Sequence, residues 1–215
     1  QFTPDKIPIG LCTHIFYAFA AVNVTTFEAT AYGSYADITL KNFYGRNNLK
    51  QNQPGLKTLL SFGGWGESQT RIYSTLAADP RKRSIFVESA WEMANQYGFD
   101  GIDLDWEYPG APDRFNYIDL LKDLKYASGG KLLTAAISSD VMIGYNIPLM
   151  DEYLDFFNVM TYDFYGDDDT EIGHHASYSE TIHSLQLWNL RGALKNKMLM
   201  GIPAYGVGWI ANRCA

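Results

Sequence analysis

Short apolar runs recur along this chain, and stretches with helical periodicity separate them. The runs cover residues 13–20, 57–62, 101–106, 131–138, 156–162 and 198–202. Each run has the length of a strand, and most are too apolar to leave one face in water, which is typical of a sheet covered on both faces. Because a tight turn cannot join two parallel strands, strands that alternate with helices predict an α/β fold built on a parallel sheet.

Three of the intervening stretches carry helix signals. Asp79 and Pro80 provide an N-cap and a first-turn proline for a helix that Gly98 ends. Two further helices have apolar stripes near residues 115–124 and 182–188. The stripe residues that we expect to face the core are Ile85, Phe86, Ser89, Met93 and Tyr97 in the first helix, Phe115, Ile118, Leu121 and Leu124 in the second, and Ile182, Leu185 and Trp188 in the third.

Two architectures fit this alternation, the open doubly wound sheet and the closed (β/α)8 barrel of the TIM type. The glycine-rich residues 63–66 do not fit the dinucleotide fingerprint of the first. Polar or aromatic residues gather at the C-terminal ends of the strands, where a barrel builds its active site: Phe19, Trp65, Glu107, Ser138, Ser139, Tyr162, Asp163 and Tyr205. A barrel usually needs roughly 250 residues, and this chain has 215. We therefore predict an incomplete barrel of about six strands that forms one domain over residues 1–215, with no second domain.

Charge and hydropathy disfavour some classes of partner. A net charge of −7 disfavours nucleic acid, which needs a basic surface. No stretch approaches the roughly 18 consecutive apolar residues of a membrane span. The basic residues 81–83 fall in the first turns of a predicted helix, where we expect them to face solvent. The glycosylation sequon at Asn23 is consistent with a secreted protein, which we expect to be a monomer.

The sequence predicts no metal site and no cofactor. Cys12 and Cys214 lie near opposite ends without metal-ligand spacing, and their pairing stays open. The adjacent His174 and His175 would point in opposite directions in an extended chain. The acidic run 167–169 is expected to be solvated.

Residues 100–107, Asp-Gly-Ile-Asp-Leu-Asp-Trp-Glu, place acids in a stretch that otherwise reads as a buried strand. Side chains two apart share one face, so Asp103, Asp105 and Glu107 point one way and the apolar residues the other. Carboxylates about 6 to 7 Å apart repel as anions, so at least one should keep its proton near neutral pH and act as an acid. Glu107, the last of the row, is the natural donor. Asp100 has the opposite parity and should support the start of the strand.

The alternative for this acidic row is a calcium site. A calcium loop needs oxygen-rich residues between the acids and a glycine at its sixth position. Leu104 and Trp106 stand between the acids here, so we favour acid–base chemistry.

The Asp-x-x-Asp-x-Asp-x-Glu pattern of residues 100–107 resembles the signature of family 18 glycoside hydrolases, the chitinase family. Residues 11–20 (LCTHIFYAFA), 61–65 (SFGGW), 160–163 (MTYD) and 201–206 (GIPAYG) are similar to the second, third, sixth and seventh barrel strands of that family. By this resemblance the first strand of the family would precede Gln1, and the eighth would follow Ala215. Val207 stands where relatives often carry arginine.

The resemblance implies a retaining hydrolysis of β-1,4-linked N-acetylglucosamine polymers, in which the acetamido group of the substrate attacks the anomeric carbon. Neighbours on one strand approach a sugar from the same side, so Asp105 cannot act as nucleophile opposite Glu107. Glu107 would protonate the glycosidic oxygen, Asp105 would orient the acetamide, and Asp103 would share a proton below it. Tyr162 would bind the acetamido oxygen, and Asp163 would position sugar hydroxyls.

Other candidate sugar-binding residues are Phe19, Trp65, Tyr108, Met160 and Tyr205. For each aromatic ring, packing at the rim is the alternative to stacking on a sugar. The expected partners are chitin or N-acetylglucosamine oligosaccharides. Three alternatives stay open: a chitooligosaccharide-binding lectin, an inactive fragment, and an endoglycosidase that cuts N-glycans. Relatives that are lectins commonly lose the final glutamate of the motif, and this chain keeps Glu107.

Overall fold

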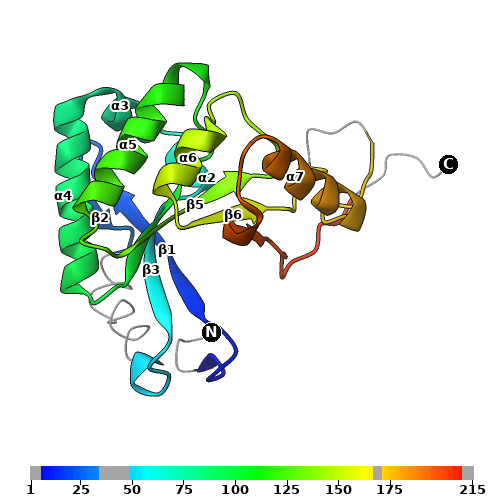
Figure 1. The fold of residues 1–215 in the computed structure, drawn as a ribbon, viewed down its shortest axis with the longest axis horizontal. Helices are drawn as coiled ribbons and strands as arrows, with labels where there is room; N and C mark the ends of the chain where they lie inside the picture. The colour runs from blue at the N-terminus through cyan, green and yellow to red at the C-terminus, as the bar shows by residue number, and fades with distance from the viewer. Residues whose placement is uncertain (1–5, 34–48, 167–170, 210–215) are drawn as a thin grey trace.

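The computed structural model describes residues 6–33, 49–166 and 171–209. Seven strands in this part of the chain form one sheet in the order β2-β1-β3-β4-β5-β6-β7 (Figure 1). The strands are β1 (His14–Val22), β2 (Ala29–Ala31), β3 (Lys57–Gly63), β4 (Gly101–Asp105), β5 (Leu132–Ser138), β6 (Phe156–Met160) and β7 (Met198–Met200). β1 and β3 to β7 run parallel, each to its neighbour in this order. The predicted parallel sheet is therefore confirmed.

The helices alternate with the strands. The α-helices are α2 (Trp65–Ser68), α3 (Ile72–Ala78), α4 (Pro80–Gln96), α5 (Arg114–Ala127), α6 (Ile147–Tyr153) and α7 (Tyr178–Leu190), and the 3-10 helices are η3 (Leu49–Gln51), η4 (Ala111–Asp113) and η5 (Lys195–Lys197). The predicted N-cap is confirmed, because Asp79 accepts a hydrogen bond from the backbone amide of Arg81 at 2.9 Å. The sequence did not predict α2, α3 and α6, which are too short to show a helical period. Helices α3 to α6 gather on one side of the sheet, and α7 lies beside β6 (Figure 1).

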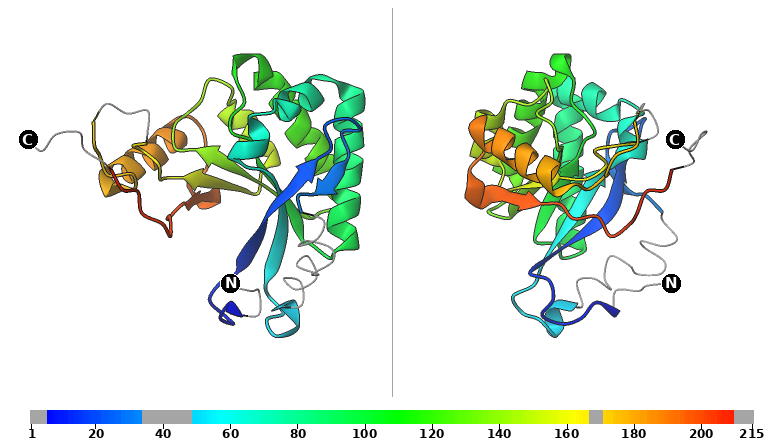
Figure 2. Two further views of the ribbon diagram at one scale, coloured as in Figure 1. Left: turned by 180° about the vertical axis from the view of Figure 1, so that it is seen from behind. Right: turned by 90° about the vertical axis from the view of Figure 1, so that its right-hand side faces the viewer.

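The sheet stays open in the described part of the chain. At one end, β7 leaves Leu199 44% and Met200 49% exposed. At the other end, β1 continues to Val22, and its last three residues pair with the antiparallel strand β2, which the sequence did not predict. Figure 2 shows β1 and β3 extending away from β6 and β7 instead of meeting them. This arrangement is the incomplete barrel that the sequence predicted.

The core lies between the sheet and helices α3 to α6, and parts of the three predicted stripes do not belong to it. Ile85 is 40% and Phe115 is 68% exposed. The buried face of α4 consists of Arg83, Phe86, Val87, Ala90, Trp91 and Ala94. Ile85 therefore lies outside that face, and Phe115 lies in the first turn of α5. In α7, Trp188 is buried and the partly buried Leu185 packs against the core. Ile182 lines a surface cavity of about 520 Å³.

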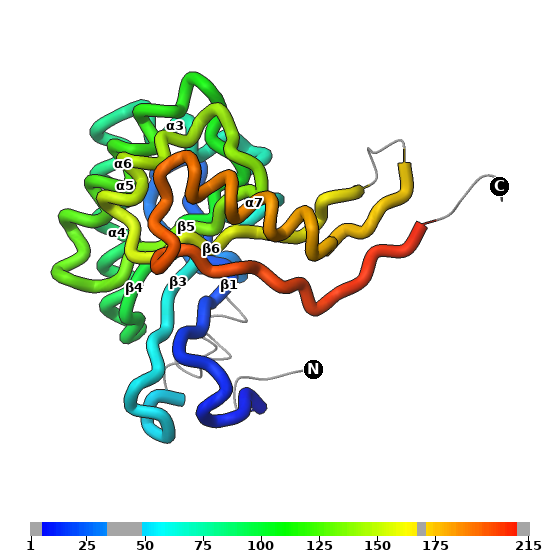
Figure 3. The backbone as a smooth tube through the Cα atoms, turned by 45° about the vertical axis from the view of Figure 1, so that its right-hand side comes forward, coloured from blue at the N-terminus to red at the C-terminus, as the bar shows by residue number. Residues whose placement is uncertain are grey.

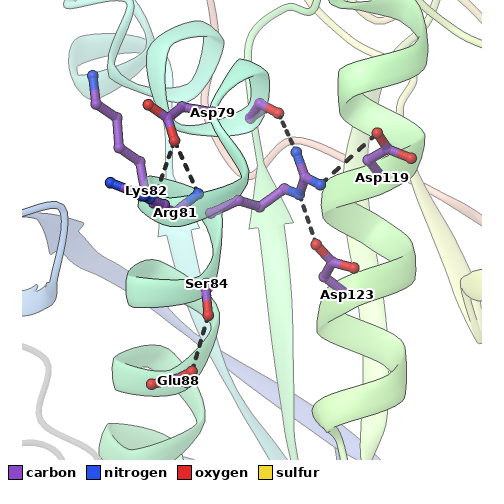
Figure 4. A network of polar contacts seen from close by, with 9 residues as sticks. Asp79, Arg81, Lys82, Ser84, Glu88, Asp119 and Asp123 are labelled. Carbon is purple, nitrogen blue, oxygen red and sulfur yellow. Dashed lines mark hydrogen bonds and ion pairs between the residues drawn. The ribbon is translucent and has the colours of Figure 1, made fainter.

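Arg83 contradicts the expectation that the basic cluster faces solvent. Its side chain is 11% exposed. Its Nε donates to Oδ2 of Asp123 at 2.7 Å, and its Nη1 donates to the carbonyl oxygen of Ala77 at 2.7 Å. Figure 4 shows Asp119 and Asp123 on the neighbouring helix α5. Arg83 takes a core position because these contacts satisfy its guanidinium group and join α3, α4 and α5.

Some sequence expectations concern residues outside the described part of the chain. Cys12 forms no disulfide with any described residue, and Cys214 lies outside the described residues. The acidic run 167–169 also lies outside them. Over the described residues, no helix combines the length and the apolar character that a membrane crossing requires.

Candidate active site

Asp103 lies at the centre of a buried polar cluster between three strands. Its Oδ2 accepts a hydrogen bond from Oγ of Ser61 at 2.6 Å. Its Oδ1 accepts from Oγ1 of Thr134 at 2.5 Å and from Nδ2 of Asn158 at 3.0 Å. The side chain is almost fully buried, and burial raises its pKa although the three hydrogen bonds act in the opposite direction. The innermost acid is therefore tied to β3, β5 and β6.

Sequence reasoning missed these three partners of Asp103. Ser61, Thr134 and Asn158 are polar residues within runs that are otherwise apolar, and that irregularity was the available signal. The hydrogen bonds described for Asp103 all go to these three residues and none goes to Asp105. The proton that we expected Asp103 and Asp105 to share therefore stays a prediction. The two acids interact through charge, since Asp103 contributes to the raised pKa of Asp105.

Asp105 is the acid with the most perturbed proton affinity. Its side chain is buried at the end of β4, and its Oδ1 has no hydrogen-bond partner among the described residues. Burial, followed by the charges of Glu107 and Asp103, raises its pKa to about 8. We expected one acid of the row to keep its proton near neutral pH, and Asp105 is the acid that does so. The sequence had pointed to Glu107 instead.

Glu107 lies just beyond the end of β4 and is half-buried. Its backbone amide donates to Oγ of Ser68 on α2 at 2.9 Å, and its carboxyl group is hydrogen-bonded to the hydroxyl of Tyr108. Burial raises its pKa, the bond from Tyr108 lowers it, and the charge of Asp163 raises it further. A carboxyl group that keeps its proton to higher pH suits a general acid. Glu107 also lines a cavity of about 500 Å³ that reaches Arg71 and Asp113.

The segment after β6 brings a tyrosine and an aspartate to the same end of the sheet. Tyr162 is half-buried, and burial, followed by the charges of Asp105 and Glu107, raises its pKa. Its hydroxyl therefore stays protonated near these acids. The chain after β7 passes close to this ring, because a Cβ at Gly201 would lie 2.8 Å from Cε1 of Tyr162. Only glycine permits that approach.

The predicted sugar-binding side chains differ in how far they are exposed. Trp65 is 63% and Tyr205 is 51% exposed. Phe19 is partly buried against Gly64, where a Cβ would lie 2.7 Å from its ring. Tyr108 packs against the core with its hydroxyl bonded to Glu107, which gives it a polar contact that the sequence did not predict.

Two further residues have more local roles. Met160 ends β6 opposite Ser138. Asp100 supports the strand start as predicted, because its Oδ2 accepts from the amide of Thr58 at 2.8 Å. Its pKa is lowered, since bonds and charges from Lys50 and neighbouring groups outweigh burial.

The two adjacent histidines have different surroundings. His174 is exposed, whereas the ring of His175 stacks on Tyr205 and its Nδ1 lies 3.3 Å from Oδ1 of Asp163. Sequence reasoning missed His175, because the stacking partner lies 30 residues further along the chain. Within the described ranges, no group of three or more His, Cys, Asp and Glu side chains is arranged to hold a metal ion.

The sequence also matches known proteins over its whole length. A family model described as glycosyl hydrolases family 18 matches residues 1–214. This chain belongs to that family. As a family 18 chain, it is 37% identical over 245 residues to a probable endochitinase of Caenorhabditis elegans, with 100% of this chain and 39% of that protein covered. The resemblance drawn from residues 100–107 is thereby confirmed.

Solved family 18 structures share the fold. A Group IV chitinase of Ostrinia furnacalis in complex with allosamidin has a TM-score of 0.85 and 34% identity, and the match covers 94% of this chain and 61% of that one. Catalytic domain 2 of the Group II chitinase of the same species, in a complex with (NAG)5, has a TM-score of 0.83 and 31% identity. The match covers 93% of this chain and 58% of that one. This chain therefore spans less than two thirds of each of these relatives.

The raised pKa of Asp105 predicts a stability that falls as pH rises. An aspartate in the unfolded chain ionises near 3.8, whereas Asp105 in the folded protein ionises near 8. Between these values the folded state holds a proton that the unfolded state has released, so the free energy of unfolding decreases with pH. We expect Asp105→Asn to exceed the parent protein in stability at pH 8 by an amount on the order of a few kcal/mol, with a smaller gain at pH 5, as measured by urea unfolding. A gain that is equal at both pH values would contradict the raised pKa.

Proposed function

We propose that this chain forms part of a chitinase that hydrolyses β-1,4-linked N-acetylglucosamine polymers with retention of anomeric configuration. Relatives that carry chitinase names support the reaction class. The complex with (NAG)5 in a solved relative supports an oligosaccharide as the ligand.

The observation that carries the proposal is the unpaired oxygen of Asp105. Buried polar atoms in folded proteins are almost always hydrogen-bonded, yet Oδ1 of Asp105 has no partner among the described residues. Asp103 below it is fully engaged, and Glu107 lies on the same side two residues further along. An N–H group of a bound ligand would satisfy this oxygen. The acetamido group of N-acetylglucosamine carries such a donor next to the anomeric carbon.

The proposed reaction has two steps. In the first, the acetamido oxygen attacks the anomeric carbon, the glycosidic bond breaks, and Glu107 gives its proton to the departing oxygen. Asp105 passes its proton to Asp103, and as an anion it orients the acetamido N–H and offsets the positive charge of the cyclic oxazolinium ion. The hydroxyl of Tyr162 binds the acetamido oxygen. In the second, Glu107 takes a proton from water, which attacks the same carbon and restores the acetamide. Two inversions give net retention.

The remaining site residues would bind the sugar chain. Trp65 and Tyr205 present exposed rings that can stack on sugar faces. Phe19 and Met160 would form partly buried walls of the groove, and Tyr108 would support Glu107 through its hydroxyl. Asp163 would position sugar hydroxyls, and Asp103 would share the proton of Asp105.

An extracellular location is part of the same proposal. The sequon residue Asn23 is exposed on a turn, where its Oδ1 accepts from the backbone amides of Thr25 and Thr26 at 2.9 and 3.1 Å. An exposed asparagine in a turn is a typical acceptor for N-glycosylation. A polymer such as chitin would also be met outside the cell.

The proposed function is tested by incubating the purified chain with chitopentaose and, as a matched control, with cellopentaose, which lacks acetamido groups. We expect new reducing ends from chitopentaose only, released first as the β-anomer when followed by NMR. Binding of chitopentaose without release of reducing ends would select the lectin alternative. Release of the α-anomer, or equal release from cellopentaose, would contradict substrate assistance.

A further inference from the structure

The carboxylate of Asp163 is held from two sides by residues that are distant in sequence. Its Oδ2 accepts a hydrogen bond from the hydroxyl of Tyr205 at 2.6 Å, and its Oδ1 lies 3.3 Å from Nδ1 of His175. The rings of His175 and Tyr205 are stacked, with centroids 5.3 Å apart and an angle of 28° between their planes. The side chain of His175 is 14% exposed, against 57% for Asp163. His175 and Tyr205 therefore form one packed unit that binds both carboxylate oxygens.

The backbone around His175 keeps the imidazole in this position. The amide of Phe164 donates to the carbonyl oxygen of His175 at 3.0 Å. Gly173 lies against the ring of Tyr165, where a Cβ would be 2.4 Å from the ring atoms. Figure 3 shows the segments that follow β6, precede α7 and follow β7 extending side by side. The contact between His175 and Asp163 is thus fixed by main-chain contacts as well as by the two side chains.

Asp163 is connected electrostatically to Glu107. After burial and the bond from Tyr108, the charge of Asp163 is the further cause that acts on the pKa of Glu107, and it raises that pKa. A group that moves Asp163 or offsets its charge therefore changes the proton affinity of Glu107. His175 is in direct contact with Asp163 and is itself a titratable group.

We propose that His175 is a positioning residue for the hydrolysis: together with Tyr205, it fixes the Asp163 carboxylate beside Glu107. This role rests on the proposed function. An imidazole that donates its Nδ1–H to Oδ1 of Asp163 holds the carboxylate oxygen that Tyr205 does not bind.

No other cation faces this pair among the residues that the structure describes. The titratable groups around it are Asp163 and Tyr205, its neighbour His174 and, beyond Asp163, the groups of Tyr162, Glu107 and Asp105. Val207 and Trp209 line the adjoining cavity of about 330 Å³ together with both histidines and carry no charge. His175 and Tyr205 are therefore the side chains that hold the Asp163 carboxylate.

Two substitutions separate the hydrogen bond from the stacking contact. His175→Phe keeps a ring on Tyr205 but has no donor, and His175→Asn keeps a donor near the position of Nδ1 but has no aromatic ring. On chitopentaose we expect kcat of H175F to fall about 10-fold with a smaller change in KM. We expect H175N to recover to within about 3-fold of the parent, because its side-chain amide can still donate to Asp163. His174→Asn is the matched control, and replacing the exposed His174 should leave kcat unchanged.

The outcomes separate this role from the proposed function. A parent chain that turns over chitopentaose while H175F retains its kcat would overturn the role of His175 alone. Equal effects in the His174 variant would overturn it as well, since the contact with Asp163 would then be irrelevant. A parent chain without turnover would overturn the proposed function and this role together. Thermal unfolding of each variant checks that a loss of kcat does not reflect a loss of folded protein.

Discussion

Replacement of Glu107 by glutamine is expected to lower kcat on chitin oligosaccharides by about 10³-fold, within the range typical of general acid–base catalysis. Glutamine has nearly the same shape and can keep the bond from the hydroxyl of Tyr108, but it cannot donate a proton to the glycosidic oxygen or accept one from water. KM should change little, because the substitution removes an interaction that develops only in the transition state. Steady-state kinetics on chitopentaose would measure this effect.

A second substrate makes the test of Glu107 more specific. An aryl chitobioside has a leaving group that departs without protonation, so formation of the cyclic intermediate should lose less rate in the variant than it does with chitopentaose. Glu92→Gln, which changes an exposed glutamate on α4, is the matched control and should retain parental kinetics. Activity of the Glu107 variant close to that of the parent on both substrates would remove Glu107 from the role of acid.

Replacement of Asp105 by asparagine is expected to lower kcat on N-acetylated substrates by about 10²-fold. The asparagine carbonyl can still accept the acetamido N–H, but it carries no charge to offset the oxazolinium ion. The loss of kcat should be greatest for the substrates whose acetamido oxygen attacks the anomeric carbon most readily. We therefore expect the variant to lose much of the preference of the parent for an N-acetyl over an N-trifluoroacetyl aryl glycoside, as measured by kcat/KM for each.

The control for Asp105 lies at the same end of the sheet. Asp140 is an exposed acid just after β5, and Asp140→Asn should leave both substrates unaffected. An equal loss of kcat/KM on the two glycosides in the Asp105 variant would argue against anchimeric assistance. In that case the role of Asp105 would lie in the packing of β4. The urea unfolding of Asp105→Asn at pH 5 and pH 8 measures that contribution to stability independently of activity.

Much of the fold was predictable because it depends on local pattern. Apolar runs of strand length, the cap formed by Asp79 and Pro80, and the spacing of helices between strands each reflect the preferences of a few adjacent residues. The errors occurred where local pattern carries little information. Helix α2 is 4 residues long, and α3 and α6 are 7 residues long each, so none of them shows a helical period. The short strand β2 forms by pairing with β1.

The candidate site divides in a similar way. The alternation of a strand placed Asp103, Asp105 and Glu107 on one face without any knowledge of the fold, and that shared face predicted the repulsion that contributes to the raised pKa of Asp105. Burial is the main cause of the raised pKa of all three acids. The sequence could not say which acid would be most perturbed. That depends on burial and on hydrogen-bond partners, and Asp103 receives three such partners whereas Oδ1 of Asp105 has none among the described residues.

By itself the sequence determined the parallel sheet, the row of acids and the family to which the chain belongs, because each is encoded in residues that are close along the chain. Only the tertiary structure decided which groups lie against those acids. The register between strands brought Ser61 and Thr134 to Asp103, and the packing of two loops brought His175 and Tyr205 to Asp163. Such contacts depend on how distant segments come together on folding, and no local preference of these residues specifies them.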